Sequence, residues 1–74
     1  MTPAEFKSAR LACGLNLADW AIALGYRNTT RDGLRQQAHD MEAGRKAISP
    51  QVARLAEMYR RYGVPEDLRS APET

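Results

Sequence analysis

The chain has 74 residues, of which 11 are basic and 9 acidic, and its formal net charge at pH 7 is +2. A chain this short buries only about 60% of its unfolded surface, so we expect one domain with one small core. So small a charge does not by itself indicate nucleic-acid binding. No paired carboxylates, phosphate loop or nucleophile with its base indicates an enzyme, so we expect no catalytic residue, metal or cofactor.

Several features of the sequence bear on the compartment. Its apolar runs stay well short of the roughly 20 residues that cross a bilayer, so we expect no membrane span. The single cysteine, Cys13, excludes an intramolecular disulfide and favours a reducing compartment. The first residues contain no basic and apolar leader, so we expect no secretory signal and a cytoplasmic protein.

Two helices are predicted in the first third of the chain. Thr2 can cap the first, with a proline next and a glutamate completing a capping box, and Gly14 ends it. Asn16 can cap the second, which Gly25 ends. The apolar stripes expected to face the core are Phe6, Ala9 and Cys13 in the first helix, and Trp20, Ala21 and Leu24 in the second.

Two more helices are predicted in the second half. The third covers residues 34–43, and a start at Arg31 stays open because Gly33 lowers helix stability by about 1 kcal/mol relative to alanine. Ser49 followed by a proline starts the last helix, which Gly63 ends. The expected inner stripes are Leu34, Ala38 and Met41, then Val52, Leu55, Ala56 and Tyr59.

No segment shows the alternation typical of a strand, so the predicted fold is all-α, with four main helices. The predicted domain covers residues 1–63. Residues 64–74 contain two prolines and few apolar side chains, so we expect a flexible C-terminal tail.

The outer face of the third predicted helix is rich in Arg and Gln. Its residues that point outward or sideways are Arg35, Gln36, Gln37, His39 and Asp40. Arg and Gln can make bidentate contacts with guanine and adenine in the DNA major groove, so this helix is a candidate reader of bases. An ordinary polar helix face is the alternative. His39 has no partner at metal-ligand spacing, which leaves it a surface residue or a DNA contact.

The order of several residues resembles a known family. Gly14-Leu15-Asn16, then Ala21 and Leu24-Gly25, resembles the opening of the helix-turn-helix in lambdoid phage repressors, Cro proteins and the xenobiotic-response-element (XRE) regulators. Glu42-x-Gly44-Arg45-Lys46 resembles the end of their recognition helix and the following loop. The resemblance covers residues 2–62 and implies a small lambda-repressor-like domain of four to five helices that binds double-stranded DNA.

The resemblance also implies roles for particular residues. Arg10 and Glu42 would form the family's internal ion pair, and Ala21 would let the two helices of the motif approach closely. Positions matching Arg35, Gln36 and Gln37 would face base edges. The candidate phosphate or connector contacts are Asn16, Arg27, Asn28, Thr29, Thr30, Arg31, Arg45 and Lys46.

This chain departs from the family pattern in two places that concern DNA. Leu17 stands where the family usually has a glutamine that helps to clamp a phosphate. The connector before the third helix is also several residues longer than the family turn. Its extra segment, Arg27 to Arg31, either extends the recognition helix or forms a loop that adds DNA contacts.

The resulting hypothesis is a sequence-specific DNA-binding transcriptional regulator, an autoregulating repressor from a phage or other mobile element. Specific binding by so small a reading helix favours a homodimer on a palindromic operator, joined through the last helix (Met58, Tyr62) or the tail. No small-molecule ligand is expected. The alternative is an antitoxin or adaptor module that uses the same fold to bind a protein.

Overall fold

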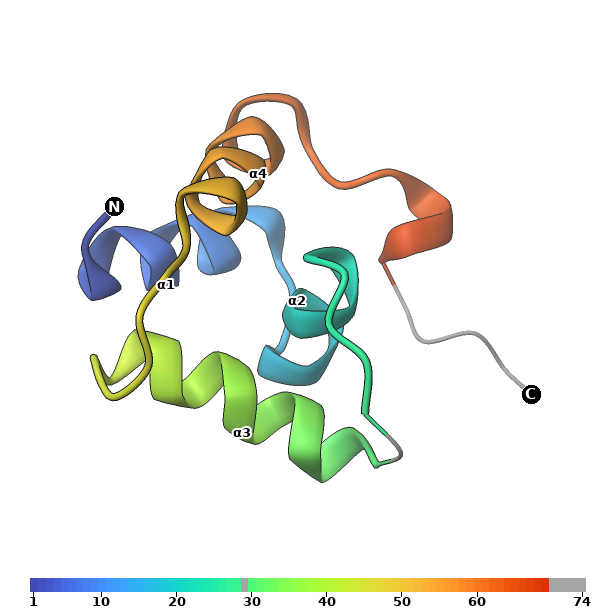
Figure 1. Ribbon diagram of the computed structural model, residues 1–74. Coiled ribbons are helices and arrows are strands. Elements are labelled where there is room, and N and C mark those ends of the chain that lie inside the picture. Colours follow the sequence, from blue (N-terminus) through green and yellow to red (C-terminus); the bar gives the residue numbers. More distant parts are fainter. Residues whose placement is uncertain (29, 70–74) are drawn as a thin grey trace.

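The structure, a computed structural model, describes residues 1–28 and 30–69 of the chain. Within these ranges it contains four α-helices, a short 3-10 helix and no strand (Figure 1). The elements are α1 (Pro3–Cys13), α2 (Leu17–Ala23), α3 (Arg31–Glu42), α4 (Pro50–Tyr62) and the 3-10 helix η1 (Glu66–Leu68). The protein is therefore a small all-α domain, as predicted. Among the residues described, none of these helices has the length and apolar character to cross a membrane.

The predicted helix caps are present. The Thr2 hydroxyl accepts the backbone N–H of Glu5 at 3.1 Å, and the Glu5 carboxylate accepts the backbone N–H of Thr2 at 2.8 Å. Asn16 caps α2 and Ser49 caps α4 in the same way, each through its side-chain oxygen. Gly14 ends α1 with φ of +70°, a left-handed conformation that glycine adopts without steric cost. The boundaries of these helices therefore follow from local hydrogen bonding.

The start of α3, which the sequence left open, lies at Arg31. Thr30 caps the helix by accepting the backbone N–H of Gly33 at 3.0 Å. The side chain of Asn28 lies against this first turn, where a Cβ at position 33 would collide with it, and its Oδ1 accepts the backbone N–H of Thr30 at 3.2 Å. The glycine that weakens the helix is thus what allows the connector to pack on it. Thr29 lies outside the described residues.

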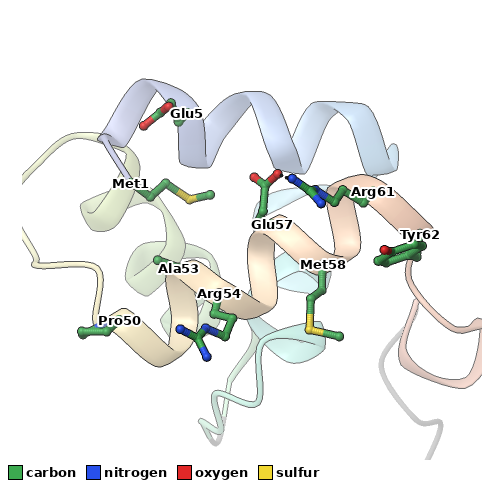
Figure 2. Close-up of a pocket in the computed structure, with 9 residues that line it drawn as sticks. All are labelled: Met1, Glu5, Pro50, Ala53, Arg54, Glu57, Met58, Arg61 and Tyr62. Atoms are coloured by element: carbon green, nitrogen blue, oxygen red, sulfur yellow. Dashed lines mark hydrogen bonds and ion pairs between the residues drawn. The ribbon is translucent and has the colours of Figure 1, made fainter.

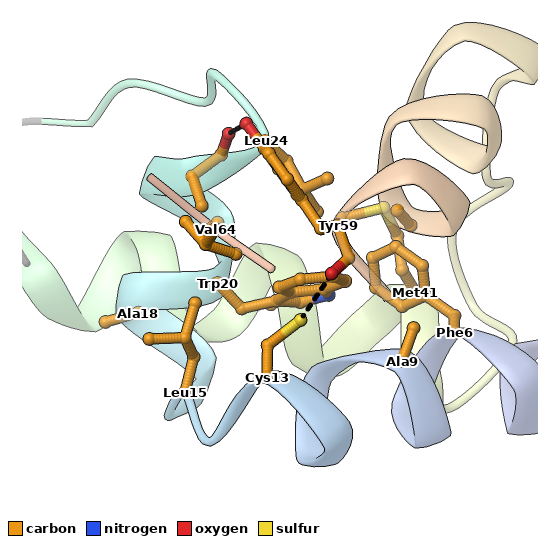
Figure 3. Packing of buried hydrophobic residues seen from close by; sticks show 14 of the residues in the cluster. Phe6, Ala9, Cys13, Leu15, Ala18, Trp20, Leu24, Met41, Tyr59 and Val64 are labelled. Atoms are coloured by element: carbon orange, nitrogen blue, oxygen red, sulfur yellow. Dashed lines mark hydrogen bonds between the residues drawn. The ribbon is translucent and has the colours of Figure 1, made fainter. Parts of the chain in front are cut away.

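The core is built around Trp20, which is fully buried (Figure 3). Its ring meets Phe6 of α1 edge to face at 5.6 Å and Tyr59 of α4 at 6.1 Å, measured between ring centroids. α1 packs against α4, while α3 packs against α2 and α1. The predicted stripes of α1, α2 and α3 are all buried, and in α4 Ala56 and Tyr59 are buried while Val52 and Leu55 are half-buried.

Two hydrogen bonds involving Tyr59 join helices across this core. The Tyr59 hydroxyl donates to the carbonyl of Ala23 at the end of α2 at 2.6 Å. The Cys13 thiol donates to the Tyr59 carbonyl at 3.4 Å, and burial raises the pKa of this thiol. Cys13 is therefore a core residue held as the neutral thiol at neutral pH.

The chain packs further toward the C-terminus than predicted. Val64, placed in the flexible tail by its sequence context, is buried in the core, and η1 lies against α2. Arg69 donates from Nη2 to the carbonyl of Cys13 at 3.1 Å. The boundary at Gly63 was too early, because the residue after this glycine turns back into the core. Residues 70–74, the rest of the predicted tail, lie outside the described part.

Replacing Tyr59 by phenylalanine tests the buried hydroxyl. We expect Tyr59→Phe to lower the free energy of unfolding by about 1–2 kcal/mol, because the Ala23 carbonyl loses its partner inside the core. The melting temperature should fall by roughly 5–10 °C in circular dichroism. Tyr62→Phe removes the same hydroxyl from a ring that is 80% exposed and should leave the melting temperature unchanged. Equal melting temperatures for both variants would contradict the role given to this bond.

Candidate nucleic-acid interface

α3 lies along one side of the molecule (Figure 1), and its exposed residues are Arg31, Asp32, Arg35 and Gln36. α3 packs mainly against α2, whose Ala18 and Ala21 are buried. Small side chains let two helices approach closely, so α2 supports α3 without covering its outer face. This side of the fold therefore presents α3 to solvent along its length.

An ion pair fixes the C-terminal end of α3 to α1. Arg10 donates from Nε to Glu42 Oε2 at 2.6 Å and from Nη2 to Oε1 at 3.2 Å. Its Nη1 donates to the carbonyl of Leu15 at 3.0 Å. The two charged side chains are only 13% and 8% exposed. The ion pair that the family resemblance implies is present, and it joins α1, the turn after α1 and α3.

The five candidate base-reading residues differ in exposure. Arg35 and Gln36 are exposed, whereas Gln37, His39 and Asp40 are half-buried. Gln37 Oε1 and His39 Nδ1 are buried and find no hydrogen-bond partner within residues 1–28 and 30–69. Of these five residues, Arg35 and Gln36 are therefore the most accessible to a ligand.

Aspartates lie beside the arginines on this side of the molecule. Two of them, Asp19 and Asp32, were not among the candidate site residues predicted from the sequence. Arg31 Nη2 lies 3.0 Å from Asp19 Oδ1, and Arg35 Nη2 lies 2.9 Å from Asp32 Oδ1. Asp40 Oδ1 accepts from Gln36 Nε2 at 2.9 Å and lies 3.4 Å from Arg45 Nη1. The spacing of Asp32 and Arg35, three residues apart on a helix, was the available signal for one of these pairs.

The starts of α2 and α3 enclose a groove of about 500 Å³. Its lining residues are Arg10, Asn16, Leu17, Ala18, Arg31, Asp32 and Arg35. The side-chain oxygen of Asn16 caps α2, and Leu17 lies half-buried as the first residue of that helix. The structure thus brings three of the predicted contact residues, Asn16, Arg31 and Arg35, to one groove.

The loop after α3 carries two more of the predicted contacts, Arg45 and Lys46. The backbone N–H groups of Arg45 and Lys46 both donate to the carbonyl of Asp40, at 2.8 and 3.2 Å. Lys46 Nζ lies over the ring of Tyr26, 5.1 Å from its centroid, a cation–π contact. The connector residues Arg27 and Asn28 are exposed beside Tyr26 in the sequence. Basic side chains from the connector and from this loop are therefore available to solvent.

A second groove, of about 700 Å³, lies between α4 and the start of α1 (Figure 2). It is lined by Met1, Glu5, Pro50, Ala53, Arg54, Glu57, Met58, Arg61 and Tyr62. Met58 and Tyr62 are 52% and 80% exposed. Hydrogen bonds from Arg60 and Arg61 lower the pKa of Glu57 to about 2, so this carboxylate stays ionised. The groove combines exposed apolar side chains with charges of both signs, on elements other than α2 and α3.

Comparison with protein-family models, curated proteins and solved structures finds no match to the chain. In the part of the chain that the structure describes, no three His, Cys, Asp or Glu side chains come together as metal ligands would. The functional argument therefore rests on the geometry of the two grooves and of α3.

The ion pair beneath α3 can be tested by removing one of its charges. We expect Glu42→Gln to lower the free energy of unfolding by about 2–4 kcal/mol, because Arg10 would keep a largely buried charge without its counter-ion. Asp32→Asn removes the exposed partner of Arg35 and should have a much smaller effect. Chemical denaturation measures both. If Glu42→Gln lowers the free energy of unfolding no more than Asp32→Asn does, the Arg10–Glu42 pair does not hold α3 in place.

Proposed function

We propose that this protein is a sequence-specific double-stranded DNA-binding transcriptional regulator that inserts α3 into the major groove. The observation that carries the proposal is the exposed pair Arg35 and Gln36 on a helix whose inner face is fixed by α2 and by the Arg10–Glu42 ion pair. An α-helix fits the width of the major groove, and Arg and Gln match the edges of guanine and adenine. A reading helix on a second supporting helix is the geometry of a helix-turn-helix.

Residues on both sides of α3 supply the expected phosphate contacts. Asn16 and Arg31 lie at the groove between the starts of α2 and α3. Arg45 and Lys46 lie in the loop at the other end of α3. Phosphate contacts set the register of a protein on DNA, and base contacts supply the sequence preference.

The protein would act as a homodimer on a palindromic operator. Each bidentate side-chain contact to a base contributes only about 1–3 kcal/mol of discrimination, so two copies of α3 are needed for useful specificity. The longest Cα extent of the protein, 33 Å, is close to one turn of DNA, about 34–36 Å, the usual spacing of half-sites. Covering a promoter then gives repression, and the XRE-type resemblance favours a cytoplasmic, autoregulating repressor of phage or mobile-element origin.

A second function, protein binding by an antitoxin or adaptor module, is favoured by one observation. The groove at α4 exposes Met58 and Tyr62, and it belongs to elements other than the proposed reading helix. Exposed apolar patches of this kind often mark protein contacts. Footprinting on the DNA upstream of the protein's own gene decides between the two functions: a protected palindrome supports the regulator, while indifference to DNA together with a stable protein complex supports the module.

The reading residues can be tested by truncating them. We expect Arg35→Ala or Gln36→Ala to weaken binding to the operator by roughly 5- to 100-fold, and to weaken binding to random duplex much less, because each loses base contacts worth about 1–3 kcal/mol. Fluorescence anisotropy measures both affinities. Arg60→Ala, a matched loss of charge on α4, should keep the preference for the operator. An unchanged preference in the α3 variants would move base reading elsewhere.

Lys46 tests the phosphate contacts. We expect Lys46→Ala to weaken binding to every duplex and to reduce the slope of log affinity against log salt by about 0.9, the contribution of one phosphate contact. Lys7→Ala on α1 removes the only other lysine and should leave the slope as it is. A salt slope identical to that of the unaltered protein would remove Lys46 from the phosphate contacts.

A further inference from the structure

The side of the molecule that carries α3 is less basic than its arginines suggest. Five basic residues lie on or beside α3, namely Arg27, Arg31, Arg35, Arg45 and Lys46. Three of them have an aspartate within 3.4 Å: Asp19 for Arg31, Asp32 for Arg35 and Asp40 for Arg45. Three of these five basic side chains are therefore already paired in the free protein.

These pairs matter because sequence-independent binding to DNA comes mainly from cations that neutralise phosphates. A guanidinium held by a carboxylate must exchange that partner before it neutralises a phosphate. The carboxylate itself also repels the duplex. Both effects reduce the affinity for any DNA, whatever its sequence, and this reduction is largest where the aspartate lies on the contact surface itself.

Two of the three aspartates lie on α3. Asp32, in the first turn, is 2.9 Å from Arg35 Nη2 and 3.3 Å from its Nε. Asp40 lies two turns further and accepts from both Gln36 and Arg45 through one oxygen. The two side chains proposed to read bases, Arg35 and Gln36, are thus each hydrogen-bonded to an aspartate of the same helix.

We propose that Asp32 and Asp40 are specificity-determining residues, an inference that rests on the proposed DNA-binding function. Their carboxylates orient Arg35 and Gln36 and suppress binding to random sequence. A matching operator compensates for the exchanged ion pairs because its base edges accept hydrogen bonds from Arg35 and Gln36. A random duplex offers phosphates but no matching set of base edges, so it does not compensate for the loss of the aspartate contacts. Asp40 is on this basis a positioning residue that does not itself read a base.

The test compares Asp32→Asn and Asp40→Asn with Asp67→Asn. Asp67 is exposed on η1, so its replacement makes the same change of net charge away from α3. Affinities for the operator found by footprinting and for a random duplex are measured by fluorescence anisotropy over a series of salt concentrations, with folding checked by thermal melts. We expect the two α3 variants to bind random duplex roughly 3- to 10-fold tighter, with a salt slope steeper by about one contact. The ratio of operator affinity to random-duplex affinity should become smaller in these two variants. Asp67→Asn should change neither affinity much.

Three results would overturn the inference. One is an equal gain in random-duplex affinity for all three variants, which would reflect net charge alone. Another is unchanged binding of Asp32→Asn and Asp40→Asn to random duplex. The third is a preference for the operator in Asp32→Asn and Asp40→Asn that is as large as in the unaltered protein, which would mean that the two carboxylates do not set specificity.

Elution from heparin separates this inference from the proposed function. Heparin is a polyanion without base edges, so it reports the paired cations whether or not the protein regulates transcription. Higher salt for elution of Asp32→Asn and Asp40→Asn than of Asp67→Asn supports the neutralising role of the two aspartates, and equal elution overturns it. If the unaltered protein shows no preference for any duplex, the proposed function fails independently of the heparin result.

Discussion

The packing of one tryptophan holds the fold together. Trp20 lies on α2, a helix of only seven residues, yet its ring contacts aromatic rings from both α1 and α4. In a domain of this size few other side chains are large enough to reach three helices. Because α2 carries the tryptophan on one side and supports α3 on another, the position of α3 depends on how firmly this ring is packed.

The Arg10–Glu42 pair adds orientation to that packing. Burying two charges is costly, and an apolar pair of similar volume often gives equal or better stability. What an apolar pair would lack is direction: the bidentate guanidinium also binds the Leu15 carbonyl, so it fixes the angle of α3 relative to α1 and to the turn before α2. A helix that must present side chains to a rigid partner benefits from such a constraint more than from additional stability.

The parts of the fold that the sequence predicted are those with local causes. The caps at Thr2, Asn16 and Ser49 bond to backbone groups three residues away, so a short pattern suffices to identify them. The burial of Val64 and the contact between Asn28 and Gly33 depend on the tertiary structure. A periodic pattern in the sequence does not predict such contacts.

The candidate site divides in the same way. The polar residues of α3 were visible from the helical repeat, and the Arg10–Glu42 pair, 32 residues apart in the sequence, came only from the family resemblance. The aspartate partner of Arg31 lies on another helix and followed from neither.

These paired arginines agree with the proposed function, which is selective DNA binding by a chain with a net charge of only +2. A strongly basic surface binds any duplex, so a genome's many non-specific sites compete with the operator. Under the proposed function, a surface on which arginines are paired with aspartates attracts any duplex less strongly and depends on base contacts from two subunits. In the proposed function, a dimer supplies the second set of base contacts that such a surface needs.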